Sequence, residues 1–528
     1  MGPSFDPEFR APLRRLAVRI GATLLVVGLV AIPGDALASE GWSQFQGDAA
    51  HTGTVDPGVQ APLKESWHLD VPLGGPGHEL GLSAPVLAED TVITVSPTSV
   101  IGVDLATGVQ RWTVARAFGP STPPAVAAIG GRAVLLYTEG FGSHPPGSTP
   151  TSTPSQTASV SVSPAGTPSG GSSTPAQGGA FDSRLVAIDL TTRKPFWDPV
   201  QLDRVSRTGV TIDGGTAFLG DNSGKIYAVD LATGHVRWTQ KADGYVYTPL
   251  AASAGKVFAT VQGGASGTAS LVAMNQSDGS VAWRVAQRGE NFVTAPAVGG
   301  GAVVAGFALV TSGGVSSTVV RAIDAASGVT RWSSTTGTIP TPIGAPAVTS
   351  DAVIAFDASG QAYRFDLRTG ARVWDFALNE RVFRTSPAVT AAQVFVPTSA
   401  GRLVALDAAT GELVWQLPPS GDMLRDGLLT SGSLVLVRGG SHPGLVAFSH
   451  DPSGTLVRVA SPTTVNLSLL LGGFVLAAVP LGVALVLGGR WLVARAGAPF
   501  PDPSDPDDPI DPYDADDQDD PEERDDLP

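Results

Sequence analysis

Residues 226–238 read IYAVDLATGHVRW. Apolar residues alternate before Asp230, which predicts a β-strand, and Asp230, Thr233 and Gly234 then predict a tight turn. Asp and Thr side chains bond nearby backbone amides, and Gly accepts the positive φ that closes a hairpin. A second strand, which carries Trp238, returns from the turn, so the stretch is predicted to be one β-hairpin.

This hairpin recurs along the chain, and a tryptophan marks the same position in each copy. The repeat tryptophans are Trp67, Trp112, Trp197, Trp238, Trp283, Trp332, Trp374 and Trp415. Upstream of the hairpin a second turn recurs at residues 221–224, 357–360 and 398–401, and a short apolar strand that contains a proline recurs at residues 295–298, 345–348 and 386–389. Four short strands in each repeat predict one blade of a β-propeller, and the tryptophans are expected to serve blade packing.

The spacing of the tryptophans locates an insert. Successive tryptophans are 41 to 49 residues apart, except for a gap of 85 residues between Trp112 and Trp197. Residues 143–180 are rich in Ser, Thr, Pro and Gly, and subtracting these 38 residues from 85 leaves an ordinary spacing of 47. This low-complexity insert is predicted to be a flexible, exposed loop in the second blade.

The two ends of the repeat array complement each other. Residues 428–448 form a half-repeat without a tryptophan, and residues 63–69 resemble a closing strand with no blade before it. Joining them gives an eighth blade that closes the ring and removes exposed strand edges. The predicted fold is therefore an all-β, eight-bladed propeller over residues 39–458, with a seven-bladed propeller as the alternative.

The N-terminus predicts export. Four arginines between residues 10 and 19 precede an apolar run from Ile20 to Ile32, and a small-x-small sequence ends at Ala38 before Ser39. This layout predicts a signal peptide over residues 1–38, cleaved between Ala38 and Ser39. An uncleaved anchor is the alternative, although thirteen apolar residues are short for a membrane span of about twenty.

The C-terminus predicts a membrane anchor and an acidic tail. Leu467 to Leu487 contains no charged residue, so a transmembrane helix is predicted over residues 465–489. Arg490 and Arg495 follow and favour a cytoplasmic C-terminus. Residues 499–528 hold fourteen acidic residues and one arginine, so residues 490–528 are predicted to be a disordered cytoplasmic tail, either simply solvated or docking a basic partner.

The composition argues against a local metal site and against nucleic-acid binding. The chain has no cysteine, and its seven histidines lack the spacing of a local metal site, so each is interpreted as a solvated surface residue. The net charge is −15, of which −13 lies in the tail, so the rest of the chain is near neutral. That balance argues against nucleic-acid binding. An excess of Arg over Lys, with abundant Ala, Gly and Pro, suggests a bacterial source.

The repeats resemble those of the quinoprotein-like, or PQQ-repeat, propeller family. The match is carried by residues 226–238 and by residues 42–53, WSQFQGDAAHTG, which look like the opening segment of that family. The resemblance covers about residues 42–450 and implies the fold. It leaves the function open, because the family includes pyrroloquinoline quinone (PQQ) dehydrogenases, an outer-membrane assembly scaffold and sensor ectodomains. The chain lacks the vicinal cysteine pair of many alcohol-oxidising members, and no calcium ligands can be assigned, which favours the non-dehydrogenase branch.

A binding surface is expected where the repeats differ. The links from the outer strand of one blade to the inner strand of the next lie on one rim of a propeller, and loops on rigid scaffolds concentrate function. Arg and Tyr are enriched there, as suits protein recognition or an anionic ligand. The candidate rim residues are Arg204, Arg207, Tyr245, Tyr247, Arg288, Glu290, Asn291, Arg381, Arg384, Asp422, Arg425 and Asp426; a merely solvated rim is the alternative.

The sequence thus predicts a monomeric, extracytoplasmic propeller, anchored by a single membrane span, that acts as a protein-interaction scaffold or a ligand-sensing ectodomain. No catalytic, metal or cofactor residue is assigned. The alternative is a PQQ-dependent alcohol or sugar dehydrogenase with calcium.

Overall fold

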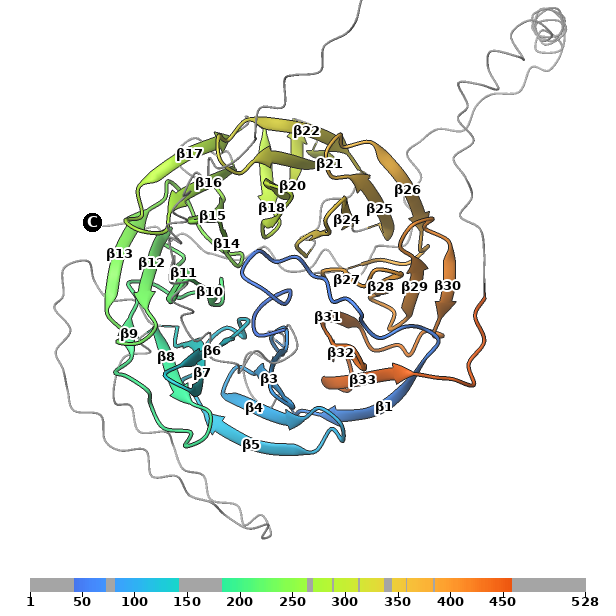
Figure 1. Cartoon of the computed structure of the whole chain (residues 1–528), viewed down its shortest axis with the longest axis horizontal. Helices are drawn as coiled ribbons and strands as arrows, with labels where there is room; N and C mark the ends of the chain where they lie inside the picture. Colours follow the sequence, from blue (N-terminus) through green and yellow to red (C-terminus); the bar gives the residue numbers. More distant parts are fainter. Residues whose placement is uncertain are drawn as a thin grey trace, which may run out of the picture. The chain divides into compact units, whose positions relative to one another are not determined.

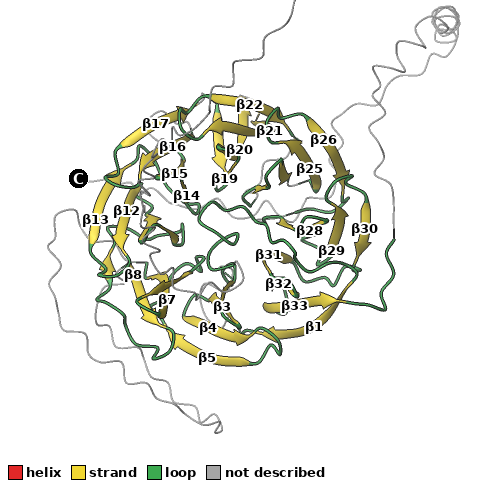
Figure 2. Cartoon of the chain, in the orientation of Figure 1, coloured by secondary structure: helices red, strands yellow, loops and turns green. Residues whose placement is uncertain are grey.

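The computed structural model describes residues 42–72, 81–141, 183–263, 269–286, 289–311, 314–336, 344–357, 359–382 and 385–457. Within these ranges the chain consists of strands and loops (Figure 2). The strands form eight sheets around a central axis (Figure 1). The predicted all-β, eight-bladed propeller is confirmed, and the seven-bladed alternative is wrong.

Four predicted segments lie outside the described residues. They are the signal peptide with its Ala38–Ser39 cleavage point, the insert 143–180, the transmembrane helix 465–489 and the tail 490–528. Among the residues that the structure does describe, no helix is long and apolar enough to cross a membrane.

Each blade is an antiparallel sheet that begins at the axis and ends at the perimeter. Blade 1 contains β2 (Val86–Ala88), β3 (Thr91–Val95), β4 (Ser99–Asp104) and β5 (Gln110–Ala115). Blade 2 contains β6 (Ala125–Ile129), β7 (Arg132–Glu139), β8 (Arg184–Asp189) and β9 (Val200–Gln201). Blade 3 contains β10 (Thr211–Asp213), β11 (Thr216–Gly220), β12 (Lys225–Asp230) and β13 (Val236–Lys241). Blade 4 contains β14 (Ala251–Ser253), β15 (Lys256–Val261), β16 (Ser270–Asn275) and β17 (Val281–Ala286).

Blade 5 departs from this pattern, because two inner strands pair with different parts of one long neighbour. It contains β18 (Glu290–Val293), β19 (Ala297–Gly299), β20 (Ala302–Thr311), β21 (Gly314–Asp324) and β22 (Thr330–Thr335). Blade 6 contains β23 (Ala347–Val348), β24 (Ala352–Phe356), β25 (Gln361–Asp366) and β26 (Arg372–Ala377). Blade 7 contains β27 (Ala388–Val389), β28 (Gln393–Pro397), β29 (Leu403–Asp407) and β30 (Leu413–Gln416).

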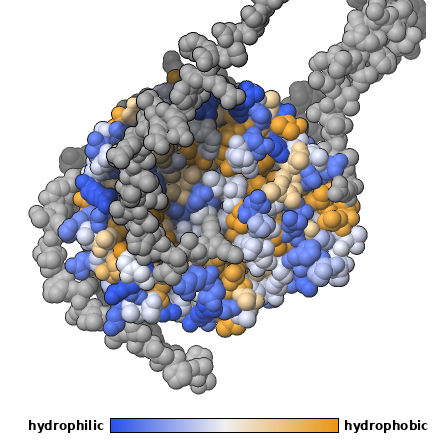
Figure 3. All heavy atoms as spheres, in the orientation of Figure 1, coloured by the Kyte–Doolittle hydropathy of each residue, from blue (hydrophilic) through white to orange (hydrophobic). Residues whose placement is uncertain are grey.

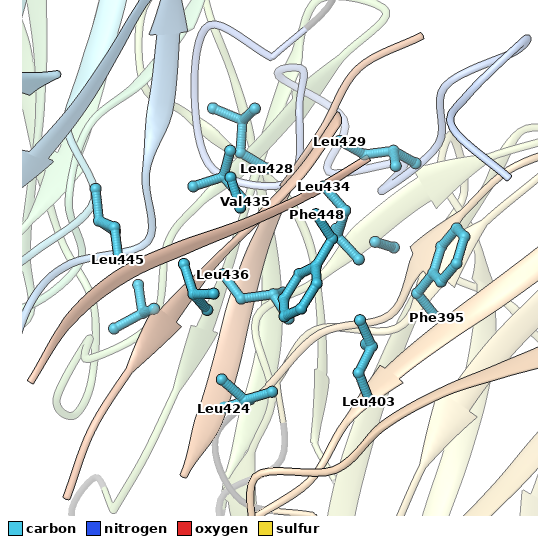
Figure 4. Packing of buried hydrophobic residues seen from close by; sticks show 14 of the residues in the cluster. Phe395, Leu403, Leu424, Leu428, Leu429, Leu434, Val435, Leu436, Leu445 and Phe448 are labelled. Atoms are coloured by element: carbon cyan, nitrogen blue, oxygen red, sulfur yellow. The ribbon is translucent and has the colours of Figure 1, made fainter. Parts of the chain in front are cut away.

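Blade 8 is built from both ends of the propeller sequence. Its inner strands are β31 (Leu424–Leu429), β32 (Ser433–Arg438) and β33 (Gly444–His450), and its outer strand is β1 (Leu63–Asp70). In Figure 1 the blue β1 lies beside the orange β33. Leucine and phenylalanine side chains of blades 7 and 8, including Phe395 and Phe448, fill the core there (Figure 4). The ring is therefore closed by strand pairing as well as by packing.

Most of the repeat tryptophans join their blade to the next one. Six of them, Trp67, Trp197, Trp238, Trp283, Trp332 and Trp374, donate the indole N–H to a backbone carbonyl in the next blade's outer turn, at 2.7–3.1 Å. The same rings lie against the turn glycine of that blade, so close that a Cβ on Gly370 would be 2.5 Å from the Trp332 ring. A glycine here is thus required by the neighbouring blade as well as by its φ of +71°.

The contact between blades 1 and 2 has an arginine in place of the turn glycine. Arg193 occupies the turn position that glycine fills elsewhere, and it adopts a φ of +57°. Its guanidinium lies over the ring of Trp112, 5.3 Å from the ring centre, which is cation–π geometry. A positively charged side chain therefore covers the indole face that a glycine turn contacts in the other blades.

The turn aspartates accept hydrogen bonds from nearby turn residues, as the repeat pattern predicts. Asp230 accepts hydrogen bonds from the Thr233 amide and hydroxyl at 2.9 and 2.8 Å, and its other oxygen pairs with Arg237 at 2.6 Å. Arg237 and then Thr233 lower the pKa of Asp230 to about 2. A depressed carboxyl pKa stabilises the fold at neutral pH, and this contribution is lost only as the pH falls from about 4 to 2.

The contact between tryptophan and glycine can be tested with one substitution. Gly370→Ala should lower the stability by about 1–3 kcal/mol more than Gly255→Ala, because the added methyl group overlaps Trp332. Gly255 is the matched control, since it also has a positive φ, +74°, yet nothing lies within 4 Å of its added Cβ. Urea unfolding followed by tryptophan fluorescence measures both variants. Equal losses of stability would contradict the role assigned to the joint.

Candidate functional site

One rim of the propeller carries the links between blades and the second turn of each blade. The Asn222 amide donates to the Val205 carbonyl, and the Ser399 amide donates to the Arg381 carbonyl, both at 2.9 Å. Each turn is thus tied to the link that enters its own blade. Hydrophilic and hydrophobic residues are interspersed over the face seen in Figure 3. The rim is a set of short loops held by rigid strands.

Three candidate rim residues come together on two neighbouring links. Tyr245 and Tyr247 stack with ring centres 5.6 Å apart and an angle of 14°, and their exposed fractions are 48% and 36%. Tyr245 is fixed by two backbone hydrogen bonds with Gln262, each 2.8 Å. Partial burial and then Tyr245 raise the pKa of the Tyr247 hydroxyl, while the Arg207 charge acts in the opposite direction, so Arg207 is within electrostatic range of Tyr247.

Arg204 and Arg207 are both exposed and lie on the link between blades 2 and 3. Within the described residues, neither arginine forms an ion pair. The carboxylate next to Arg204 in sequence, Asp203, is instead paired with Lys225 at 2.8 Å. We call Arg204, Arg207, Tyr245 and Tyr247 the tyrosine–arginine patch. It combines a stacked aromatic surface with two exposed arginines on the neighbouring link, a combination that suits protein interfaces.

Three other candidates hold the rim itself together. Arg425 donates to the Leu82 carbonyl at 2.8 Å and lies 3.5 Å from the Asp426 carboxylate. Asp422 accepts the Ser441 amide and contacts His442, both at 2.9 Å. These residues connect blade 8 to the link that enters blade 1 and brace a turn within blade 8, so they are committed to internal contacts.

The remaining candidates lie elsewhere on the rim or outside the description. Arg381 is exposed on the link that enters blade 7, apart from the patch. Glu290 and Asn291 begin β18, where the backbone alone is described. Arg288 and Arg384 lie outside the described residues.

The sequence predictions missed a second feature, which lies at the centre of the ring. Residues 42–59, which we call the axial segment, run along the inner edges of the blades (the blue chain at the centre of Figure 1). The amide of Leu87 in blade 1 donates to the Trp42 carbonyl, and the amide of Val126 in blade 2 donates to the Ser43 carbonyl, both at 2.8 Å. Gln44 then pairs with the backbone of Ile212 in blade 3 through both side-chain atoms, at 2.7 and 3.1 Å.

The axial segment continues in the same way around the other five blades. Inner-strand amides of blades 4 to 7 donate to its carbonyls at 2.6–2.9 Å; the pairs are Ala252 with Ala49, Val298 with Ala50, Val348 with Thr52 and Val389 with Gly53. In blade 8 the direction reverses, and the Val59 amide donates to the Thr430 carbonyl at 2.9 Å. One short stretch of chain thus contacts every blade and satisfies backbone groups at the inner edges.

His51 is the buried titratable group of the axial segment. It is fully buried, its Nδ1 lies 2.9 Å from the Pro296 carbonyl, and its ring meets Phe45 edge-on at 5.1 Å. Nδ1 therefore carries the proton, and Nε2 has no partner among the described residues. Burial lowers the pKa of His51 to about 4, against smaller opposing effects of Pro296 and Asp48. The expectation that every histidine is solvated is wrong for His51.

A PQQ dehydrogenase holds its calcium ion with acidic and amide side chains. No three His, Cys, Asp or Glu side chains in the described ranges gather closely enough to hold a metal ion. Calcium also binds amide and backbone carbonyl oxygens, so this result concerns clusters of acidic, cysteine and histidine side chains alone. We derive no chemical step through a quinone from this chain.

The geometry defines an eight-bladed propeller made of quinoprotein-like repeats. A family model described as outer membrane protein assembly factor BamB matches residues 182–340 and 316–463, which together are more than half of the chain. The chain belongs to this PQQ-repeat family. No curated protein matches the sequence.

Three solved structures are similar to the chain at low identity. BamB from Moraxella catarrhalis has 16% identity and a TM-score of 0.48, covering 73% of this chain and 99% of that one. The computationally designed protein Ika8 has 13% identity and a TM-score of 0.49, with coverages of 70% and 96%. Quinohemoprotein alcohol dehydrogenase ADHIIG from Pseudomonas putida HK5 has 12% identity and a TM-score of 0.49, with coverages of 82% and 85%.

The burial of His51 predicts a pH dependence of stability. Its pKa is about 4 when folded and 6.5 ordinarily, so between these values the unfolded chain binds the additional proton and stability falls as the pH is lowered. The difference corresponds to roughly 3 kcal/mol. Asp230, with a pKa of about 2, titrates in the lower window from about pH 4 to 2, so the two effects separate.

The matched variant is His51→Gln, which keeps a polar side chain that does not titrate. Denaturant midpoints measured from pH 7 to pH 4 should decline for the native chain and stay nearly level for His51→Gln. Parallel declines in the two proteins would mean that His51 is not the group responsible.

Proposed function

We propose that the chain is a membrane-anchored, extracytoplasmic propeller that serves as a scaffold for a protein partner, and that the partner docks on the tyrosine–arginine patch. The observation that carries the proposal is the exposed stack of Tyr245 and Tyr247, together with the exposed Arg204 and Arg207 on the neighbouring link, which have no acidic partner among the described residues. Aromatic residues and arginine carry much of the binding energy at protein interfaces.

The construction of the ring supports a binding role. The patch lies on short links whose backbones are hydrogen-bonded to neighbouring turns, so little conformational entropy has to be lost on binding. The family description, which names an assembly factor, points in the same direction. The sequence patterns at the two ends support export and a single C-terminal span, with the acidic tail in the cytoplasm.

The docking surface is tested by site-specific photo-cross-linking in the full-length protein in its own membrane. A photoreactive phenylalanine at position 245 should capture a defined protein, whereas the same probe at Val329, which is exposed on the perimeter of blade 5, should not capture it. The double variant R204A/R207A should reduce the capture at position 245 at least tenfold, because a charged partner group loses both arginines.

Arg368→Ala is the matched control, since Arg368 is exposed on the outer turn of blade 6, away from the patch. Unchanged capture in R204A/R207A would contradict docking on the patch. Oxidation of an alcohol or a sugar that depends on added PQQ and calcium would favour the dehydrogenase alternative instead.

The membrane topology is tested by cysteine labelling, for which this chain is well suited because it has no native cysteine. In spheroplasts, a membrane-impermeant maleimide should label Val329→Cys directly and label Ala515→Cys only after the membrane is permeabilised. The reverse pattern, or direct labelling of both positions, would exclude a propeller outside the membrane with its tail inside.

A further inference from the structure

The axial segment has the contacts of a bound peptide. Its carbonyls accept amides from the inner strands of six blades, and the acceptors belong to residues 42–53. The side chain of Gln44 adds a two-point contact with Ile212 in a seventh blade. Backbone pairing to exposed strand edges, with side chains in pockets between them, is how proteins commonly bind extended peptides.

Side chains of the segment fill spaces that the blades provide. Trp42 is 1% exposed within the core formed with blades 7, 8 and 1, and Phe45 clusters with Ala84, Ala295 and Ala345, which precede inner strands of blades 1, 5 and 6. His51 is enclosed completely and pairs with the Pro296 carbonyl. The site therefore selects for the shape of the side chains of Trp42, Phe45 and His51. At His51 it also selects for a hydrogen bond to the Pro296 carbonyl.

We propose that the inner edges of the blades form a recognition site for an extended peptide, and that residues 42–56 are a ligand of this site that belongs to the same chain. The site takes a peptide with aromatic residues at its first and fourth positions, an amide side chain at its third and a neutral histidine at its tenth.

The position of the segment in the chain allows a test on the folded protein. Asp56 and Pro57 form an exposed turn that follows the contacts with blades 1 to 7. A protease recognition sequence inserted between them allows the full-length protein to fold first and to be cut afterwards. The cut leaves Val59 and its contact with Thr430 on the ring.

The probe is a synthetic, fluorescein-labelled peptide of residues 42–56. After the cut, the native segment should remain with the ring through gel filtration, and excess labelled peptide should exchange into the site. Uncut protein should take up at least tenfold less, because its site is filled. Peptides with Gln44→Ala or His51→Ala should bind at least tenfold more weakly than the native peptide, and a scrambled peptide should not bind.

Two results would overturn the proposal. Equal uptake by cut and uncut protein would mean that the peptide binds elsewhere. Loss of the segment together with unfolding of the ring, seen by circular dichroism, would mean that residues 42–56 are an inseparable part of the fold. The experiment does not depend on the tyrosine–arginine patch, so R204A/R207A protein should give the same exchange as the native protein.

Discussion

The contact on which the ring depends is an indole ring that lies against a turn glycine of the next blade. It combines burial of aromatic surface with a hydrogen bond from the indole N–H to the turn carbonyl, and it leaves no room for a side chain at the glycine. Because the outer turn and the tryptophan occur in the same repeat, each blade provides the surface that its predecessor needs. The chain therefore builds a ring by repeating one joint.

Two further features complete the ring: the split blade 8, which joins its two ends, and the axial segment, which pairs with its inner strand edges. Trp67 of the outer strand β1 makes the standard joint with Leu105 of blade 1, while β1 itself pairs with β33, so the last blade is covalently tied to the start of the propeller. The axial segment then satisfies backbone groups at the inner edges of all eight blades. Strand edges at the centre of the ring are thereby paired, as natural sheets require if they are to avoid adventitious association.

The sequence could predict the blades, including the split one, because hairpin turns, strand alternation and tryptophan spacing are local signals. It could not predict the burial of His51, which depends on a carbonyl 245 residues away. The rim shows the same limit. Arg425 and Arg207 look equivalent in sequence, yet Arg425 reaches the Leu82 carbonyl, 343 residues distant, while Arg207 stays exposed within electrostatic range of Tyr247. Closure of the ring therefore determines which link residues form internal contacts and which stay exposed.

Repeated residues build and close the ring, and we place the docking of a protein partner on the links of the rim. Hydrogen–deuterium exchange on the full-length protein, alone and in its native membrane with its partners, distinguishes the structural role of the inner edges from the docking role of the links. We expect the amides of Leu87, Ala252 and Val389 to be protected in both states, whereas residues 202–210 and 242–250 gain protection in the membrane. Rapid exchange at the inner edges of the isolated protein, with protection gained there rather than on these links, would contradict it.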